Sequence, residues 1–172
     1  MGSTEALMDA LAEGVMVRSG DKFIFANQQL LKIVGYSGTL DEFLCESVER
    51  WVHPDDLQAV NDYNRKRVAG ESAPESYELR LIREDGETRW VTCRANIIDW
   101  EGQRCVVGCF YDITVQKAKN REFERAESIF RNIFRLTPEV MLISSLVDGK
   151  IIDVNPAFLN VFGRRRDEVI GR

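Results

Sequence analysis

Alternating apolar and polar residues predict a group of β-strands between residues 77 and 112. The runs are rich in Val, Ile, Tyr, Trp and Thr, and the turn signals Asp85-Gly86 and Glu101-Gly102 interrupt them where hairpin loops belong. In the second run, the apolar residues that share one face are Val91, Cys93, Ala95 and Ile97. We therefore expect three antiparallel strands that lead into a helix after Thr114.

The start of the chain has the pattern of two short strands and a helix. Apolar runs at 14–17 and 22–25 flank a turn at Ser19-Gly20-Asp21, which predicts a hairpin. Asn27 then precedes helically spaced Leu, Ile and Val residues, and Gly35 follows them, as an N-cap and a C-cap would.

Helical spacing also predicts a short amphipathic helix over residues 4–13 and one or two short helices over 39–52. A longer helix begins at Pro54, since proline is favoured in a first helical turn, and Gly70 stops it. We expect His53 to cap or anchor this helix.

A last helical pattern follows Thr114 and continues up to Pro138. Apolar residues in it step by 3, 4 and 3: Phe123, Ala126, Phe130 and Ile133. This spacing is typical of a coiled-coil seam over about two heptads. The alternative is an amphipathic helix that packs on its own domains.

An internal repeat divides the chain. An offset of 128 residues aligns Asn27 with Asn155, and the same offset pairs Gly35 with Gly163. A repeat of this length indicates a tandem of domains rather than a solenoid. We expect one complete domain over 1–116, a linker helix over 117–136 and the beginning of a second domain over 137–172, in a chain that is a fragment of a longer protein.

The last predicted strand is apolar on both faces. One face carries Val106, Gly108 and Phe110. The other carries Cys105, Val107, Cys109 and Tyr111. Because both faces need cover, the second one requires the lead-in helix or a second subunit, and we expect a homodimer.

Several short motifs give this pattern a family resemblance. In chain order they are His53-Pro-Asp-Asp56, Glu78-Leu-Arg80, Arg83-Glu-Asp-Gly86, Arg89-Trp90-Val91, Gly108 and Asp112-Ile113-Thr114. Their order and spacing resemble those of a PAS domain over roughly residues 6 to 116. The resemblance implies an α+β PAS fold, a five-stranded antiparallel sheet with short helices on one face, followed by a linker helix.

The same resemblance implies a non-catalytic sensory module. In it, Asp112, Ile113 and Thr114 would relay an input state through the linker helix to a downstream output domain in the same chain, a histidine kinase or a diguanylate cyclase/phosphodiesterase unit. The alternative is a constitutive dimerisation and protein-docking domain with no ligand.

The resemblance also places a cavity between the sheet and the long helix. Candidate lining residues are Phe25, Leu57, Val60, Leu79, Val91, Cys93, Ala95, Val106, Gly108 and Phe110. Gly108 would leave room that a larger residue fills. The set suits an unidentified small ligand and an ordinary filled core alike.

Neither haem nor flavin is expected. Haem-binding relatives use a histidine inside the long helix, and the single histidine, His53, precedes that helix. Flavin-binding relatives place a reactive cysteine in an Asn-, Arg- and Gln-rich motif, which the surroundings of Cys45 lack. The four cysteines have no metal-ligand spacing and are expected to be buried thiols, and Asp55 and Asp56 are expected to point to different sides of their helix.

Charge and hydropathy argue against a nucleic-acid-binding protein and against a membrane-spanning one. The net charge is −5 over 172 residues, and the one basic cluster, Arg164-Arg165-Arg166, is typical of a solvated turn, so we expect no nucleic-acid partner. No apolar run approaches the ~18 to 20 residues that span a bilayer, and no signal peptide opens the chain. We therefore expect a cytoplasmic module without membrane contact.

Overall fold

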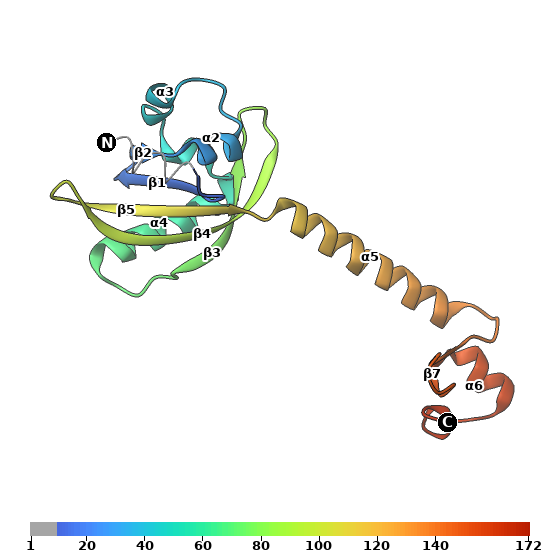
Figure 1. The fold of residues 1–172 in the computed structure, drawn as a ribbon. Coiled ribbons are helices and arrows are strands. Elements are labelled where there is room, and N and C mark those ends of the chain that lie inside the picture. The colour runs from blue at the N-terminus through green and yellow to red at the C-terminus, as the bar shows by residue number, and fades with distance from the viewer. Residues whose placement is uncertain (1–9) are drawn as a thin grey trace. The chain divides into compact units, whose positions relative to one another are not determined.

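The computed structural model describes residues 10–172, which fall into two compact units, one up to Lys117 and one from Ala118 onward (Figure 1). Most of the helix predicted over 4–13 lies outside the described residues, and residues 10–13 form a turn and a bend.

The first unit is built on a five-stranded antiparallel sheet in the order β2-β1-β5-β4-β3. The strands are β1 (Gly14–Ser19), β2 (Lys22–Ala26), β3 (Ser76–Ile82), β4 (Thr88–Trp100) and β5 (Gln103–Asp112). Between β4 and β5, Glu101 and Gly102 both have positive φ, 51° and 79°, as a tight two-residue hairpin requires. The predicted sheet and its turns are confirmed.

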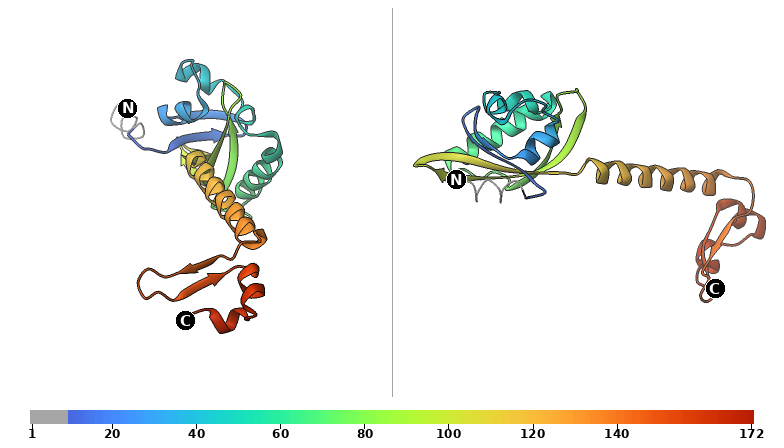
Figure 2. Two further views of the ribbon diagram at one scale, coloured as in Figure 1. Left: turned by 90° about the vertical axis from the view of Figure 1, so that its right-hand side faces the viewer. Right: turned by 45° about the horizontal axis from the view of Figure 1, so that its top comes forward.

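Helices cover one face of this sheet (Figure 2). They are α2 (Gln28–Val34), α3 (Leu40–Leu44), the 3-10 helix η1 (Val48–Trp51) and α4 (Pro54–Ala69). His53 caps α4, because its Nδ1 accepts a hydrogen bond from the Asp55 backbone N–H at 3.3 Å. The hydrophobic core lies between these helices and the sheet, and Phe43, the most buried large side chain, packs its ring against Phe23 and Trp51.

Asn27 fixes the start of α2 to the sheet. Its Oδ1 accepts hydrogen bonds from the backbone N–H groups of Val15 (2.8 Å) and Leu30 (3.0 Å). Its Nδ2 donates to the carbonyl of Glu13 at 3.0 Å. One buried amide therefore caps the helix and holds the beginning of β1.

The second unit repeats this arrangement around Asn155. Its Oδ1 accepts from the N–H groups of Met141 (3.0 Å) and Phe158 (2.9 Å), and its Nδ2 donates to Glu139 O at 2.8 Å. The elements are α5 (Thr114–Leu136), which runs across the boundary between the units, β6 (Leu142–Ser144), β7 (Ile151–Val154), α6 (Pro156–Phe162) and α7 (Arg166–Val169). The sequence repeat is therefore a structural repeat.

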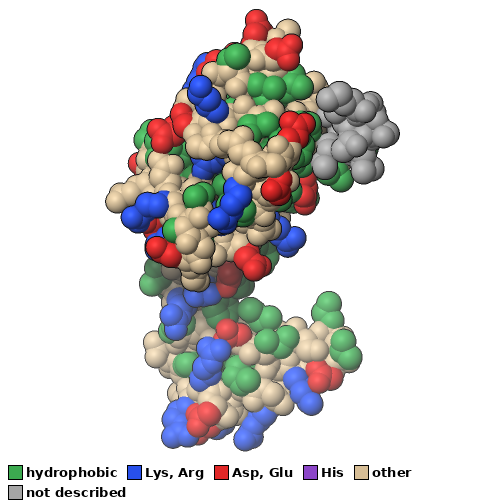
Figure 3. Space-filling model, turned by 90° about the vertical axis from the view of Figure 1, so that its left-hand side faces the viewer, with side chains coloured by type: hydrophobic (Ala, Val, Ile, Leu, Met, Phe, Trp, Pro, Cys, Tyr) green, Lys and Arg blue, Asp and Glu red, His purple; other side chains and the backbone are tan. Residues whose placement is uncertain are grey.

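The second unit has few buried side chains. Within residues 118–172 the structure contains one two-stranded sheet, β6-β7, and no further strands. Large apolar side chains remain exposed, namely Leu142, Leu146, Val147, Ile152, Val161 and Phe162. Figure 3 shows hydrophobic side chains on the surface of this unit. An isolated hairpin is marginally stable in water, so we expect this unit not to fold independently.

Truncation after about residue 126 tests that expectation. Because the second unit has no complete hydrophobic core, we expect its removal to change the melting temperature of the first unit by less than about 2 °C. A substitution on the protein surface has an effect of this size. Differential scanning calorimetry of both chains measures it. A drop of about 10 °C would mean that residues 127–172 stabilise the first unit, contrary to the expectation.

Candidate functional site

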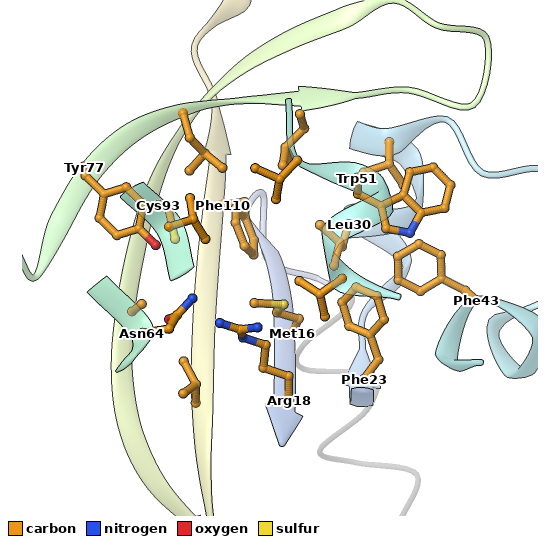
Figure 4. A pocket seen from close by; sticks show the side chains of 18 residues that line it. Met16, Arg18, Phe23, Leu30, Phe43, Trp51, Asn64, Tyr77, Cys93 and Phe110 are labelled. Carbon is orange, nitrogen blue, oxygen red and sulfur yellow. The ribbon is translucent and has the colours of Figure 1, made fainter. Parts of the chain in front are cut away.

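The first unit encloses a cavity of about 40 Å³ between the sheet and its helices. Figure 4 shows how side chains from both layers converge on it. The lining residues are Met16, Arg18, Phe23, Leu30, Val34, Phe43, Val48, Trp51, Val52, Val60, Asn64, Tyr77, Leu79, Leu81, Cys93, Ala95, Val106 and Phe110. The volume is roughly three times the ~10–15 Å³ that one water molecule needs.

The predicted lining residues fall into two groups. Val60, Leu79, Cys93, Ala95, Val106 and Phe110 lie around the cavity, whereas Phe25, Leu57, Val91 and Gly108 do not line it. Leu57 is half-buried and packs against the core, and Val91 is fully buried within it.

The prediction for Phe25 is wrong because β2 contains a bulge. β1 residues Val17 and Arg18 pair with Phe25 and Phe23, so the register shifts by one residue between them. Phe23 therefore faces the core, while Phe25 lies on the opposite face of the sheet. There its ring packs against that of Trp100, with 5.8 Å between the ring centroids.

The prediction that Gly108 leaves open room is also wrong. A Cβ built on Gly108 would meet the Met16 Cε atom at 3.1 Å and the Phe110 ring at 3.2 Å. The space beside this glycine is therefore filled by these two side chains, and the cavity lies elsewhere.

One end of the cavity is polar. Arg18, Asn64, Tyr77 and Cys93 meet there (Figure 4). Burial raises the pKa of the Cys93 thiol to about 11, so this thiol stays protonated at neutral pH. Burial, followed by the neighbouring Cys93, also raises the pKa of Tyr77 above its usual value. The polar end therefore consists of one cation and neutral groups.

Arg18 and Tyr77 line the cavity although the sequence did not predict them there, whereas Asn64 was a candidate for the inward face of α4. The run Val15-Met16-Val17 is apolar on both faces, so it does not indicate which face is inside. Once Met16 is known to face the core, period-two alternation also turns Arg18 inward.

Hydrogen bonds hold the junction between β5 and α5. The Thr114 N–H donates to Asp112 Oδ1 at 2.8 Å, and Thr114 Oγ1 accepts from the Trp90 N–H on β4 at 2.9 Å. Between them, Ile113 is buried, and its N–H donates to Trp90 O at 2.8 Å. Asp112, Ile113 and Thr114 thus join the last strand, its neighbour and the helix.

Charged side chains extend this junction across β3. Lys117 forms an ion pair with Glu78 at 2.5 Å and lies 5.1 Å from the Trp90 ring centroid. Arg80 lies 5.6 Å from the same centroid. The first turn of α5 is therefore attached to the two strands that supply Tyr77, Leu79 and Cys93 to the cavity.

Arg80 also binds the first turn of α4. Its guanidinium contacts Asp56 at 2.7 Å and Asp55 at 3.2 Å. The expectation that these carboxylates point to different sides is wrong, because a single atom, Arg80 Nη2, contacts both of them. Hydrogen bonding from Arg80 lowers the pKa of Asp56 below its ordinary value.

The outer face of β5 is only partly exposed. Tyr111 is 52% exposed and Val107 and Cys109 are half-buried, but Cys105 is 2% exposed. Cys105 therefore cannot belong to an exposed stripe, which begins at Val107. The prediction of four buried thiols is wrong for Cys45, which is exposed because it is the C-cap of the short helix α3.

Two other kinds of site are absent from residues 10–172. In this part of the chain, no three His, Cys, Asp or Glu side chains are grouped as metal ligands. No helix in the same range is long and apolar enough to cross a bilayer. Basic and acidic side chains are mixed over the face of the first unit that Figure 3 displays.

Comparisons with known families match both units. A family model described as PAS fold matches residues 23–111, and a second, described as PAS domain, matches residues 128–172. Both describe non-catalytic modules. No curated protein sequence matches the chain.

Solved structures share the fold. A PAS domain from Desulfitobacterium hafniense gives a TM-score of 0.54 at 17% identity, over 62% of this chain and 98% of that one. The PAS domain of an HTR-like protein from Haloarcula marismortui gives 0.50 at 23% identity, over 64% and 88%. A sensory box histidine kinase/response regulator from Burkholderia thailandensis gives 0.55 at 19% identity, over 75% and 98%.

Proposed function

This chain belongs to the PAS domain family, and on that premise we propose that it relays the state of its first unit through α5 to a downstream output domain. The output domain is a histidine kinase or a diguanylate cyclase/phosphodiesterase unit. Similarity of fold to a sensory box histidine kinase/response regulator supports the first of these.

The junction at Asp112–Thr114 carries this proposal. The Trp90 backbone receives a hydrogen bond from Ile113 and donates one to Thr114, and both Arg80 and Lys117 place a charged group over its ring. A change in the spacing of β3 and β4 around the cavity would therefore alter the partners of the first turn of α5. A helix start held by a few polar contacts is the kind of element that has two arrangements.

A linker-length series tests the relay. Residues 1–136 are joined to the helix of a reporter histidine kinase with zero to seven added residues, and autophosphorylation is measured. Because a rotating helix presents a face that returns every seven residues, we expect activity to be high, low and high again within one heptad. Activity that changes steadily with length would contradict the relay.

We also propose that the module is a homodimer, formed through the outer face of β5 and the adjoining helices. Val107, Cys109 and Tyr111 supply an apolar strip there, and α5 exposes Phe123, Phe130 and Ile133. An exposed apolar surface of this kind usually marks an interface.

Val107→Glu is expected to give a folded monomer in analytical ultracentrifugation, because a carboxylate cannot be buried unpaired at an interface. Ser72→Glu is the matched control, since it adds the same charge to the exposed loop between α4 and β3. A wild-type chain that is monomeric at all concentrations, or a dimeric Val107→Glu variant, would contradict the interface.

A constitutive dimerisation and docking domain is the second candidate. The small volume of the cavity, about 40 Å³, supports it, because ligand pockets are usually several times larger. Native mass spectrometry of the purified protein separates the candidates. A co-purifying small molecule favours the sensor, and a dimer of unmodified mass favours the docking domain.

A further inference from the structure

Arg18 is a buried cation without an anionic partner in the described chain. Its side chain is 6% exposed, and it forms no ion pair with any carboxylate from residue 10 onward. Nη1 donates to the Gly20 carbonyl at 3.0 Å, while Nε has no acceptor among these residues. An unpaired buried charge is costly, and its burial lowers the pKa of Arg18 below its usual value.

The groups beside Arg18 can donate hydrogen bonds. Asn64 Oδ1 already accepts from Arg67 Nη1 at 3.3 Å, so its NH₂ group is the part directed at new acceptors. Figure 4 shows the Arg18 guanidinium directed toward the Asn64 amide, with the Tyr77 hydroxyl at the same end of the cavity. No carboxylate side chain lines the cavity. This end is therefore suited to an anion rather than to a cation.

The nearest carboxylates outside the cavity have other partners. Asp21 Oδ2 accepts from Ser47 Oγ at 2.6 Å, and Glu49 Oε1 accepts from Asn61 Nδ2 at 2.7 Å. Both acids lie in an open hollow beside α4, and this hollow shares Arg18, Asn64 and Val106 with the cavity. These three residues therefore form a wall between the hollow and the cavity.

We propose that Arg18 and Asn64 bind the carboxylate of a small monocarboxylate whose apolar body occupies the cavity. The guanidinium fits this group because it forms two parallel hydrogen bonds with a carboxylate, and the remaining lining is almost wholly apolar. The volume, about 40 Å³, restricts the ligand to a short aliphatic acid. This inference rests on the proposed sensory function, since it names the class of input.

The test uses the 172-residue chain with acetate and propionate, and with propionamide as the neutral isostere of propionate. We expect both acids to raise the melting temperature saturably, and the amide to have no effect. In ¹H–¹⁵N spectra of the arginine side chains, the Arg18 Nε–H signal is expected to shift with the same saturation curve.

Two variants complete the test. Arg18→Met removes the cation but keeps an apolar side chain, and it is expected to weaken propionate binding about 10- to 100-fold, the value of hydrogen bonds to a charged group. Asn61→Ala, in the hollow but outside the cavity, is the control and is expected to keep wild-type affinity. If Arg18→Met does not fold, the Nε–H titration of the wild type decides alone.

Two results would overturn the assignment. One is an equal response to propionate and propionamide, which would mean that the cavity accepts apolar groups without regard to charge. The other is no response to either acid. Failure of the relay is recognised separately: propionate would bind through Arg18 in the purified chain, but the reporter-kinase fusion would show no periodic dependence on linker length.

Discussion

Replacing Asn27 with alanine is expected to lower the free energy of unfolding of the first unit by about 1.5–5 kcal/mol. Loss of the N-cap of α2 accounts for about 0.5–2 kcal/mol. The rest comes from the buried Val15 N–H, which loses its acceptor at 2.8 Å, because an unsatisfied buried donor costs about 1–3 kcal/mol. Since domains are stable by only about 5–15 kcal/mol, this is a large loss.

Urea unfolding followed by tryptophan fluorescence measures this change. Asn61→Ala is the control, because Asn61 is exposed and bonds only to Glu49, and we expect a change within about 0.5 kcal/mol. Asn155→Ala removes the equivalent network of the second unit and is expected to leave the transition of the first unit in place. A similar midpoint for Asn27→Ala and wild type would show that the network is dispensable.

Local signals account for the parts of the fold that the sequence predicts well. Asn27, Gly35 and Glu101-Gly102 act within a few residues of their own position, as a cap, a helix end and a tight turn. Their effect depends on the backbone next to them, so pattern analysis locates the elements correctly. The repeat adds Asn155, whose bonds match those of Asn27 atom for atom.

Which residues line the cavity depends on strand pairing and side-chain packing, and the pattern of apolar and polar residues does not reveal either. The bulge that turns Phe25 outward is a matter of pairing between β1 and β2, and neither strand alone specifies it. Arg18 was not predicted to line the cavity because an arginine is rarely buried without a partner, so this residue type is expected at the surface. Side-chain packing likewise decides that Met16 and Phe110 fill the space beside Gly108.

The junction was predicted in part. Of the residues predicted to relay the signal, Asp112 and Thr114 accept hydrogen bonds from backbone N–H groups, those of Thr114 and Trp90. The ion pair of Lys117 with Glu78 was not foreseen, because it joins residues 39 positions apart. Long-range contacts of charged side chains leave no periodic trace in a sequence.

In a fusion of residues 1–136 to a reporter kinase, Asp112→Ala is expected to make the kinase activity independent of whether the cavity is filled. The mutation removes the acceptor of the Thr114 N–H at 2.8 Å and costs the domain only about 0.5–2 kcal/mol, the usual range for a lost cap. The unit therefore stays folded, while the helix start loses one of the bonds that define its arrangement.

A cavity-filling substitution supplies the input for this test. Ala95 lines the cavity, and Ala95→Val adds two methyl groups to it in place of a bound molecule. We expect Ala95→Val to change kinase activity in the wild-type junction and to have no effect when combined with Asp112→Ala, a coupling that the double-mutant cycle measures.

Asp99→Ala is the matched control for this cycle, because Asp99 Oδ1 accepts the Gly102 N–H at 2.9 Å in the turn between β4 and β5. It removes the same kind of bond at a place that α5 does not touch, so the response to Ala95→Val is expected to persist. If Ala95→Val acts equally in the presence and absence of Asp112, the motif is a structural cap. The signal would then have to pass through Lys117 and Trp90, the other contacts that tie α5 to the sheet.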